Sequence, residues 1–202
     1  TYKDDFNVIA NVESNPYQIN NLELPTINGD RQEDSILTAS TTNLQGNLTY
    51  KWYRNGNFIT GTGTADPTYT LVQNDVNTQI SVLVETDKTN ITLAPSIETS
   101  AIQNNNDDPS GSLIISGDLF PSYNIFVDVS VIQDEDGINS ATWAYQWMRG
   151  SQLITTAMSH HTYAVVDADE GEQLKCVVAY QDNYNNSHTL ETNIVTIQNK
   201  IK

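Results

Sequence analysis

Apolar and polar residues alternate in short runs along this 202-residue chain, and Gly-, Asn- and Asp-rich segments separate the runs. Within residues 35–86 the runs read "SILTAS", "LTYKWYR", "TYTLV" and "QISVLVET", and all are rich in β-branched or aromatic residues. Alternation with a period of two predicts β-strands that bury one face. About seven such strands in roughly 90 residues predict an all-β fold, namely an immunoglobulin-like β-sandwich, with a β-barrel as the alternative.

The same pattern occurs twice. "YKWYRNG" at residues 50–56 and "YQWMRGS" at residues 145–151 both place Tyr two positions before Trp and Arg two positions after it. Aligning the two motifs also brings residues 67–84 onto residues 161–178 without a gap. Self-similarity at this spacing is typical of tandem modules. The alignment predicts two whole repeats, residues 22–104 and residues 105–202.

The first residues of the chain fit the end of such a repeat. Residues 2–21 align without a gap on residues 180–199, with Tyr on Tyr, Asp on Asp and Glu on Glu at several positions. We therefore expect residues 1–21 to be the C-terminal hairpin of a preceding, truncated repeat. The chain is then expected to be a window on a longer array.

Charge and hydropathy narrow the classes of partner. The formal net charge is −16, with only nine Lys and Arg residues. A nucleic-acid-binding protein needs clustered cations for the phosphates, so nucleic acid is not expected as a partner. No stretch of about 20 apolar residues is present, so insertion into a membrane is not expected either.

The two Trp motifs are better candidates for structural core than for a ligand site. Tyr50 and Trp52 share one face of their strand, and Tyr145 and Trp147 share the equivalent face of theirs. The sole cysteine, Cys176, cannot form an intrachain disulfide and follows the same alternation as its apolar neighbours. All five side chains are therefore predicted to be buried. The alternative, a stacking platform for sugars, would need exposed rings on the outer face, with Tyr53 as its candidate.

The pattern Y-x-W-x-R-x-G, followed by "TYTLVQNDVNTQISVLV", resembles the immunoglobulin-like repeats of large bacterial extracellular adhesins and of bacteriophage virion proteins. The family pattern also has a D-x-D-G turn before the Trp motif and the run A-D-V-G after it. The first repeat departs from both, with "NLQG" at residues 43–46 and "NDVN" at residues 74–77. The resemblance implies a place outside the cell, on a cell surface or on a virion surface. It also implies contacts with neighbouring repeats of the chain and with other virion or cell-surface subunits.

Two acidic segments are candidates for a metal site. Asp134 and Asp136 stand in the loop "DEDG", and Asp107 and Asp108 stand in the linker "NNNDDPSG". Calcium takes six to eight oxygen ligands, and carboxylates close together before a Gly turn can converge on one ion. The resemblance implies Ca²⁺ as the cofactor, because adhesin repeats of this type are often rigidified by calcium. The alternative is a solvated acidic turn.

A second candidate site lies in the longer hairpin of the second repeat. Tyr180, Tyr184 and His188 form the one aromatic grouping there, and they are the candidate residues for binding a glycan or a host receptor. The sequence has no Gly-rich phosphate loop, no G-x-S-x-G elbow and no paired His metal motif. Enzymatic activity is therefore not expected.

These observations predict a non-enzymatic structural or adhesive segment of a cell-surface or virion-surface protein. It would act as a stalk, fibre or decoration module that spaces or presents a binding element. The alternative is a recognition module that binds a glycan or host receptor through the loops of the second repeat.

Overall fold

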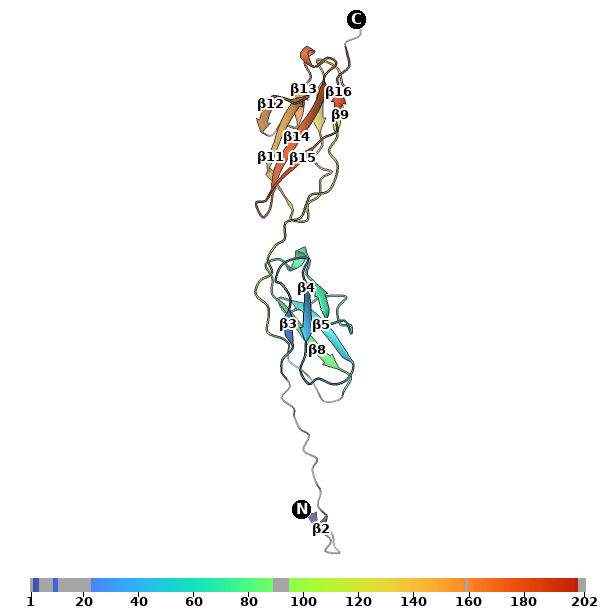
Figure 1. The fold of residues 1–202 in the computed structure, drawn as a ribbon, viewed down its shortest axis with the longest axis vertical. Coiled ribbons are helices and arrows are strands. Elements are labelled where there is room, and N and C mark those ends of the chain that lie inside the picture. The colour runs from blue at the N-terminus through green and yellow to red at the C-terminus, as the bar shows by residue number, and fades with distance from the viewer. Residues whose placement is uncertain (1, 4–8, 11–22, 89–94, 159, 200–202) are drawn as a thin grey trace. The chain divides into compact units, whose positions relative to one another are not determined.

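A computed structural model describes residues 2–3, 9–10, 23–88, 95–158 and 160–199 (Figure 1). The chain divides into two compact units, residues 1–104 and residues 105–202. Within the described residues, no helix is long and apolar enough to cross a membrane.

Residues 23–88 of the first unit contain two antiparallel sheets of three strands each, in the orders β3-β4-β7 and β6-β5-β8. Their bounds are β3 (Thr26–Asn28), β4 (Ile36–Ser40), β5 (Leu48–Arg54), β6 (Asn57–Phe58), β7 (Thr68–Thr70) and β8 (Ile80–Thr86). A single 3₁₀ turn, η1 (Gln73–Asp75), connects β7 to β8. Along the central strand β5, side chains alternate between the core and the surface as the sequence pattern predicts.

Residues 1–21 were predicted to form a hairpin. Of that segment the structure describes β1 (Tyr2–Lys3) and β2 (Ile9–Ala10), which pair antiparallel. The remainder of the predicted hairpin lies outside the described residues.

The second unit repeats this arrangement, with longer strands in one of its two sheets. One sheet has the order β13-β10-β9; the other has the order β12-β11-β14-β15, with β16 pairing alongside β14. The bounds are β9 (Ile115–Gly117), β10 (Asn124–Val127), β11 (Ile138–Arg149), β12 (Gln152–Met158), β13 (Thr162–Ala164), η2 (Asp167–Asp169), β14 (Gln173–Asp182), β15 (Ser187–Glu191) and β16 (Val195–Thr196).

Each unit has a hydrophobic core of its own, to which both of its sheets contribute. Trp52 and Trp147 are 1% and 0% exposed and are the largest buried side chains. Tyr50, Tyr145 and Cys176 are buried with them. Two separate sheets that enclose one core form a sandwich rather than a closed barrel. The chain therefore consists of immunoglobulin-like β-sandwiches in tandem.

An ion pair between a partly exposed Arg and a buried Asp joins the two sheets of the first unit. Arg54, at the end of β5, donates from Nε to Asp75 Oδ1 at 2.7 Å. Tyr69, on β7 in the other sheet, donates its hydroxyl to Asp75 Oδ2 at 2.8 Å, and the Val72 backbone N–H donates to the same oxygen at 2.9 Å. The Tyr69 ring also stacks on Trp52, with ring centroids 5.6 Å apart. We call Arg54, Tyr69 and Asp75 the clamp of the first unit.

The second unit has the same clamp, formed by Arg149, Tyr163 and Asp169. Arg149 Nε donates to Asp169 Oδ1 at 2.7 Å, and the Tyr163 hydroxyl donates to Asp169 Oδ2 at 2.9 Å. Tyr163 stacks on Trp147 with centroids 5.5 Å apart. Asp75 and Asp169 are both 0% exposed, and each carboxylate is satisfied by charged, hydroxyl and backbone donors. The Arg of the Y-x-W-x-R motif therefore holds the sandwich together.

Candidate functional site

The second unit gathers buried carboxylates at the end of β11 and β14 that lies away from its clamp. In the strand register Arg149 pairs with Leu174, whereas Ile138 pairs with Asp182 at the other end. The side chains of Asp134 and Asp182 are 0% exposed, and Asp136 is 2% exposed. We call Asp134, Asp136 and Asp182 the acidic cluster. Burial of three carboxylates is costly unless hydrogen bonds or cations compensate each of them.

Asp134 uses one carboxylate oxygen to hold its own loop and the other to fasten that loop to β14. Its Oδ1 accepts the backbone N–H of Asp136 at 3.0 Å, and its Oδ2 accepts a short hydrogen bond from the Tyr180 hydroxyl. The Gly137 N–H donates to the Asp134 carbonyl at 3.0 Å and closes the turn. Gly137 has a φ of +78°, and a Cβ there would lie 2.2 Å from Asn183 Nδ2. The loop "DEDG" therefore needs both its first Asp and its Gly for shape.

Asp182 anchors the β14–β15 turn. It accepts backbone N–H groups of Tyr184 and Asn186 at 2.8 Å and the Asn186 side-chain amide at 2.7 Å. Burial by itself would raise the pKa of Asp182, but the hydrogen bonds from Asn186 and Tyr184 and the neighbouring His188 lower that pKa below its ordinary value. The carboxylate is therefore ionised at neutral pH.

Tyr180 and His188 pack against the acidic cluster rather than on the surface. Tyr180 is 2% exposed and His188 is 7% exposed, and their rings stack with centroids 5.1 Å apart. His188 Nε2 lies 3.5 Å from Asp182 Oδ2 and 3.7 Å from Asp134 Oδ2. Burial and the bond to Asp134 raise the pKa of Tyr180. Of the aromatic trio predicted to bind a ligand, Tyr184 alone has an exposed ring.

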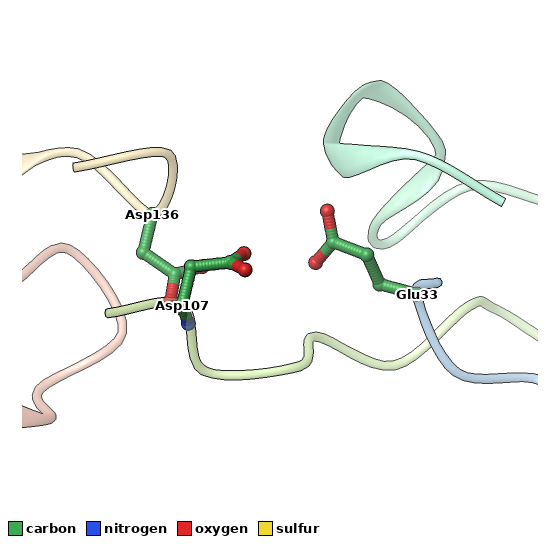
Figure 2. Close-up of side chains that lie close together, drawn as sticks. All are labelled: Glu33, Asp107 and Asp136. Atoms are coloured by element: carbon green, nitrogen blue, oxygen red, sulfur yellow. Dashed lines mark hydrogen bonds between the residues drawn. The ribbon is translucent and has the colours of Figure 1, made fainter. Parts of the chain in front are cut away.

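Asp136 meets the linker that precedes the second sandwich. The Asp107 N–H donates to Asp136 Oδ2 at 2.9 Å, and the two side chains lie adjacent in Figure 2, with ligand oxygens within 4.8 Å of each other. Asp136 Oδ1 is buried and accepts no hydrogen bond from the described residues. Glu33, also drawn in Figure 2, belongs to the first unit.

The linker and the loop together line an acidic pocket of about 310 Å³. Asp107, Asp108 and Asp134 contribute to its wall, together with Ser110, Gln133 and Glu135. Asp108 and Glu135 are exposed, and Asp107 is partly buried. Three of the four residues predicted as metal ligands therefore line one pocket, and the fourth, Asp136, accepts the Asp107 N–H. Their roles differ, because the Asp134 oxygens already accept hydrogen bonds whereas Asp136 Oδ1 accepts none from the described chain.

Hard divalent cations bind carboxylate oxygens, and the carboxylates around this pocket offer oxygen atoms as ligands. Asp107 and Asp136, whose ligand oxygens lie within 4.8 Å of each other, and Asp108, which lines the pocket, are the residues that would hold such an ion. The residue types therefore fit calcium better than a metal that prefers sulfur or imidazole ligands.

Comparisons with known proteins found only distant structural similarities. No protein-family model and no curated protein matches the chain. Among solved structures, a titin segment of successive domains matches with 10% identity and a TM-score of 0.33, covering 88% of this chain and 67% of that chain. A segment of two fibronectin type III domains from chicken tenascin matches with 11% identity and a TM-score of 0.32, covering 87% of this chain and 98% of that one. We draw nothing about function from such distant similarities.

Proposed function

We propose that the chain is a non-enzymatic structural segment of a cell-surface or virion-surface protein, in which sandwich modules space or present a binding element. The observation that carries the proposal is the repetition of one framework in both units, with the same buried Trp and the same clamp. A spacer needs modules that keep their shape independently of what they present. A clamp that joins two sheets through an ion pair with a buried carboxylate serves that need.

The environment of the sole thiol also supports a non-enzymatic role. Cys176 is 0% exposed, and burial raises its pKa to about 12. Since the thiolate is the reactive form, this side chain has the properties of a small apolar core residue and not of a nucleophile.

Single-molecule force spectroscopy on the full chain tests the spacer proposal. We expect two discrete unfolding events, one for each unit, and each should release roughly 300 Å at about 3.6 Å per residue. The variant Asp169→Asn should lower the force of one event and leave the other unchanged. A single event, or extension without discrete events, would contradict the proposal.

A specific observation favours calcium as a second element of this function. Asp136 Oδ1 is a buried carboxylate oxygen without a donor among the described residues, beside a pocket walled by further carboxylates. We propose that Ca²⁺ binds Asp107, Asp108 and Asp136 and stiffens the start of the second module. Binding to the folded state alone would stabilise this module by mass action.

Calorimetric titration of Ca²⁺ into the chelator-stripped chain tests the calcium proposal. We expect measurable heat and a rise in the melting temperature of one transition. Asp136→Asn should abolish both effects, whereas Asp118→Asn, an exposed carboxylate of the same unit outside the pocket, should preserve them. The absence of both heat and a melting shift in the unmodified chain would end the proposal.

The alternative function, recognition of a glycan or host receptor through Tyr180, Tyr184 and His188, has weaker support. Two of the three rings are buried against the acidic cluster, so a ligand at these loops would meet Tyr184 alone. If host attachment is lost in Tyr184→Ala and the melting temperature is unchanged, the recognition function replaces the spacer proposal.

A further inference from the structure

The second unit has a cavity of about 400 Å³ that belongs neither to the clamp nor to the acidic pocket. Its lining comes from β10 and the segment that follows, from β11, and from the residue preceding β13. Aliphatic side chains such as Val127 and Ile132 form part of the wall, and the rings of Trp143 and Tyr145 form another part. The exposed residues Asp128, Ser130 and His161 complete the lining. Apolar walls with a few polar groups are typical of small-molecule sites.

The aromatic part of the wall is held in place by the core. Trp143 is partly buried and contacts the buried Tyr180 ring, with centroids 4.6 Å apart. Tyr145 is 5% exposed and meets His161 edge to face at 6.3 Å. A rigid, flat aromatic surface offers contact area to a ligand at little cost in conformational entropy.

The polar lining residues offer hydrogen-bonding groups of different kinds. Asp128 Oδ1 accepts the backbone N–H of Ser130 at 2.9 Å, and hydrogen bonds from Ser130 lower the pKa of Asp128. The group is therefore an ionised acceptor at neutral pH. The His161 imidazole can donate or accept according to its tautomer. Hydroxyl groups both donate and accept, so a polyhydroxylated ligand matches this pair.

The first unit lacks these groups at the aligned positions. Where the second repeat has Trp143, Asp128 and His161, the first repeat has Leu48, Ser40 and Pro67. The first unit folds as the same kind of sandwich, so the fold does not require an aromatic ring, a carboxylate or an imidazole at these positions. The three replacements converge on the lining of one cavity.

From these observations we infer that the cavity beside Trp143 and Tyr145 is a binding site for an uncharged sugar ring. The apolar C–H face of the ring would pack on the indole, and its hydroxyls would bond with Asp128 and His161. The formal net charge of −16 disfavours an anionic sugar. The inference goes beyond the spacer function and does not depend on it, because a module that spaces a binding element can also bind.

The test is an NMR titration of the isotope-labelled full chain with methyl β-glucoside, methyl β-galactoside and N-acetylglucosamine, each added separately. We expect saturable shifts for at least one sugar, confined to residues 127–132, 138–145 and 161. A dissociation constant on the order of 1 mM is expected, since one sugar ring makes few contacts. The open-chain polyol sorbitol, which has hydroxyls and no ring face, should produce no saturable shifts.

Matched variants locate the site. Trp143→Leu introduces the residue of the first repeat and should weaken sugar binding roughly tenfold, which corresponds to about 1.4 kcal/mol. Asp128→Ser also introduces the residue of the first repeat and should weaken sugar binding. Because Asp128 is exposed, we expect this variant to fold normally. Tyr123→Ser removes an exposed ring that does not line the cavity, and binding should be unchanged.

Three results would each overturn the inference: no saturable shift with any of the three sugars, shifts that persist in both Trp143→Leu and Asp128→Ser, or shifts that map to the first unit. None of them would affect the force-spectroscopy test of the spacer proposal, so failure of one proposal is distinguishable from failure of the other.

Discussion

The two units are alike at one end of their central strand pair and unlike at the other. Where β5 and β11 end, the same Arg, Tyr and Asp form the clamp, and the Arg–Asp distance is 2.7 Å in both. At the opposite end the first unit is fastened by an exposed contact, in which Asn47 donates its backbone and side-chain N–H groups to the Asp87 carboxylate. The second unit has the buried acidic cluster there instead, with Tyr180 and His188 packed against it.

This difference distinguishes the end of the sandwich that is common to both units from the end that varies between them. The clamp joins the two sheets, so every module of this kind needs it, and both copies retain it. The other end is closed by loops whose length and residues change between the copies. New chemistry can therefore appear at that end without loss of the sandwich.

The largest effect is expected from the Trp at the centre of each core. Trp52→Ala and Trp147→Ala should each lower the free energy of unfolding by about 3–5 kcal/mol, because each leaves a large cavity. The loss should fall on the transition of the mutated unit. Urea unfolding followed by far-ultraviolet circular dichroism measures it, because the first unit keeps no Trp once Trp52 is replaced. Equal loss in both transitions from one substitution would contradict the assignment of a separate core to each unit.

The clamp should come second. In Asp75→Asn and Asp169→Asn the Arg loses its ion pair and the Tyr hydroxyl loses a charged acceptor, so we expect a loss of about 3 kcal/mol from the unit concerned. The two losses should agree closely, since the two clamps have the same geometry. Chemical denaturation of the two variants side by side makes the comparison. A large loss in one unit and none in the other would show that the clamps are not equivalent.

The opposite end should distinguish the units. Tyr180→Phe removes the hydroxyl that donates to buried Asp134 and should destabilise the second unit by about 2 kcal/mol. The matched change in the first unit is Thr86→Val, which removes a hydrogen bond to the Gln45 carbonyl on an exposed edge and should cost less. Melting temperatures of the two variants measure the difference. A larger loss from Thr86→Val than from Tyr180→Phe would contradict the ranking.

The smallest expected effect is a pH dependence of the first clamp. Burial and the hydrogen bond to Asp75 raise the pKa of Tyr69 from 10.0 to about 12. Folding therefore favours the neutral phenol. This contribution to stability is complete below about pH 10 and is lost as the pH rises toward 12. Urea midpoints of the first unit over this range should fall less steeply in Tyr69→Phe, and identical slopes would contradict the assignment.

The buried core residues were predictable because their burial depends on local alternation. The residues two and four positions before Trp52 and Trp147 are apolar or aromatic, and this alternation predicts that both Trp side chains are buried. The alignment of the two repeats also places Arg54 opposite Arg149 and Asp75 opposite Asp169. The presence of the same Arg and Asp in both repeats was the one sequence signal for the clamp. It was missed because an ion pair between residues 21 positions apart depends on how two sheets pack, which alternation does not encode.

The acidic residues show the limit of reasoning from composition. Asp134 and Asp136 are similar in the sequence, yet Asp134 accepts a hydrogen bond at each carboxylate oxygen, whereas Asp136 keeps a buried oxygen without a donor among the described residues. The sequence pattern also did not predict that Tyr180 and His188 are buried against the acidic cluster. They are paired residues on the adjacent strands β14 and β15, and this pairing directs both rings toward Asp134 and Asp182.

Hydrogen exchange measured by mass spectrometry tests most directly the claim that one clamped framework occurs twice. In Asp75→Asn we expect faster exchange in peptides from residues 23–88 and unchanged exchange in peptides from residues 113–199. Asp169→Asn should produce the reverse pattern with a similar increase. The claim would be contradicted if either substitution accelerated exchange equally in both units, or if exchange in its own unit did not change.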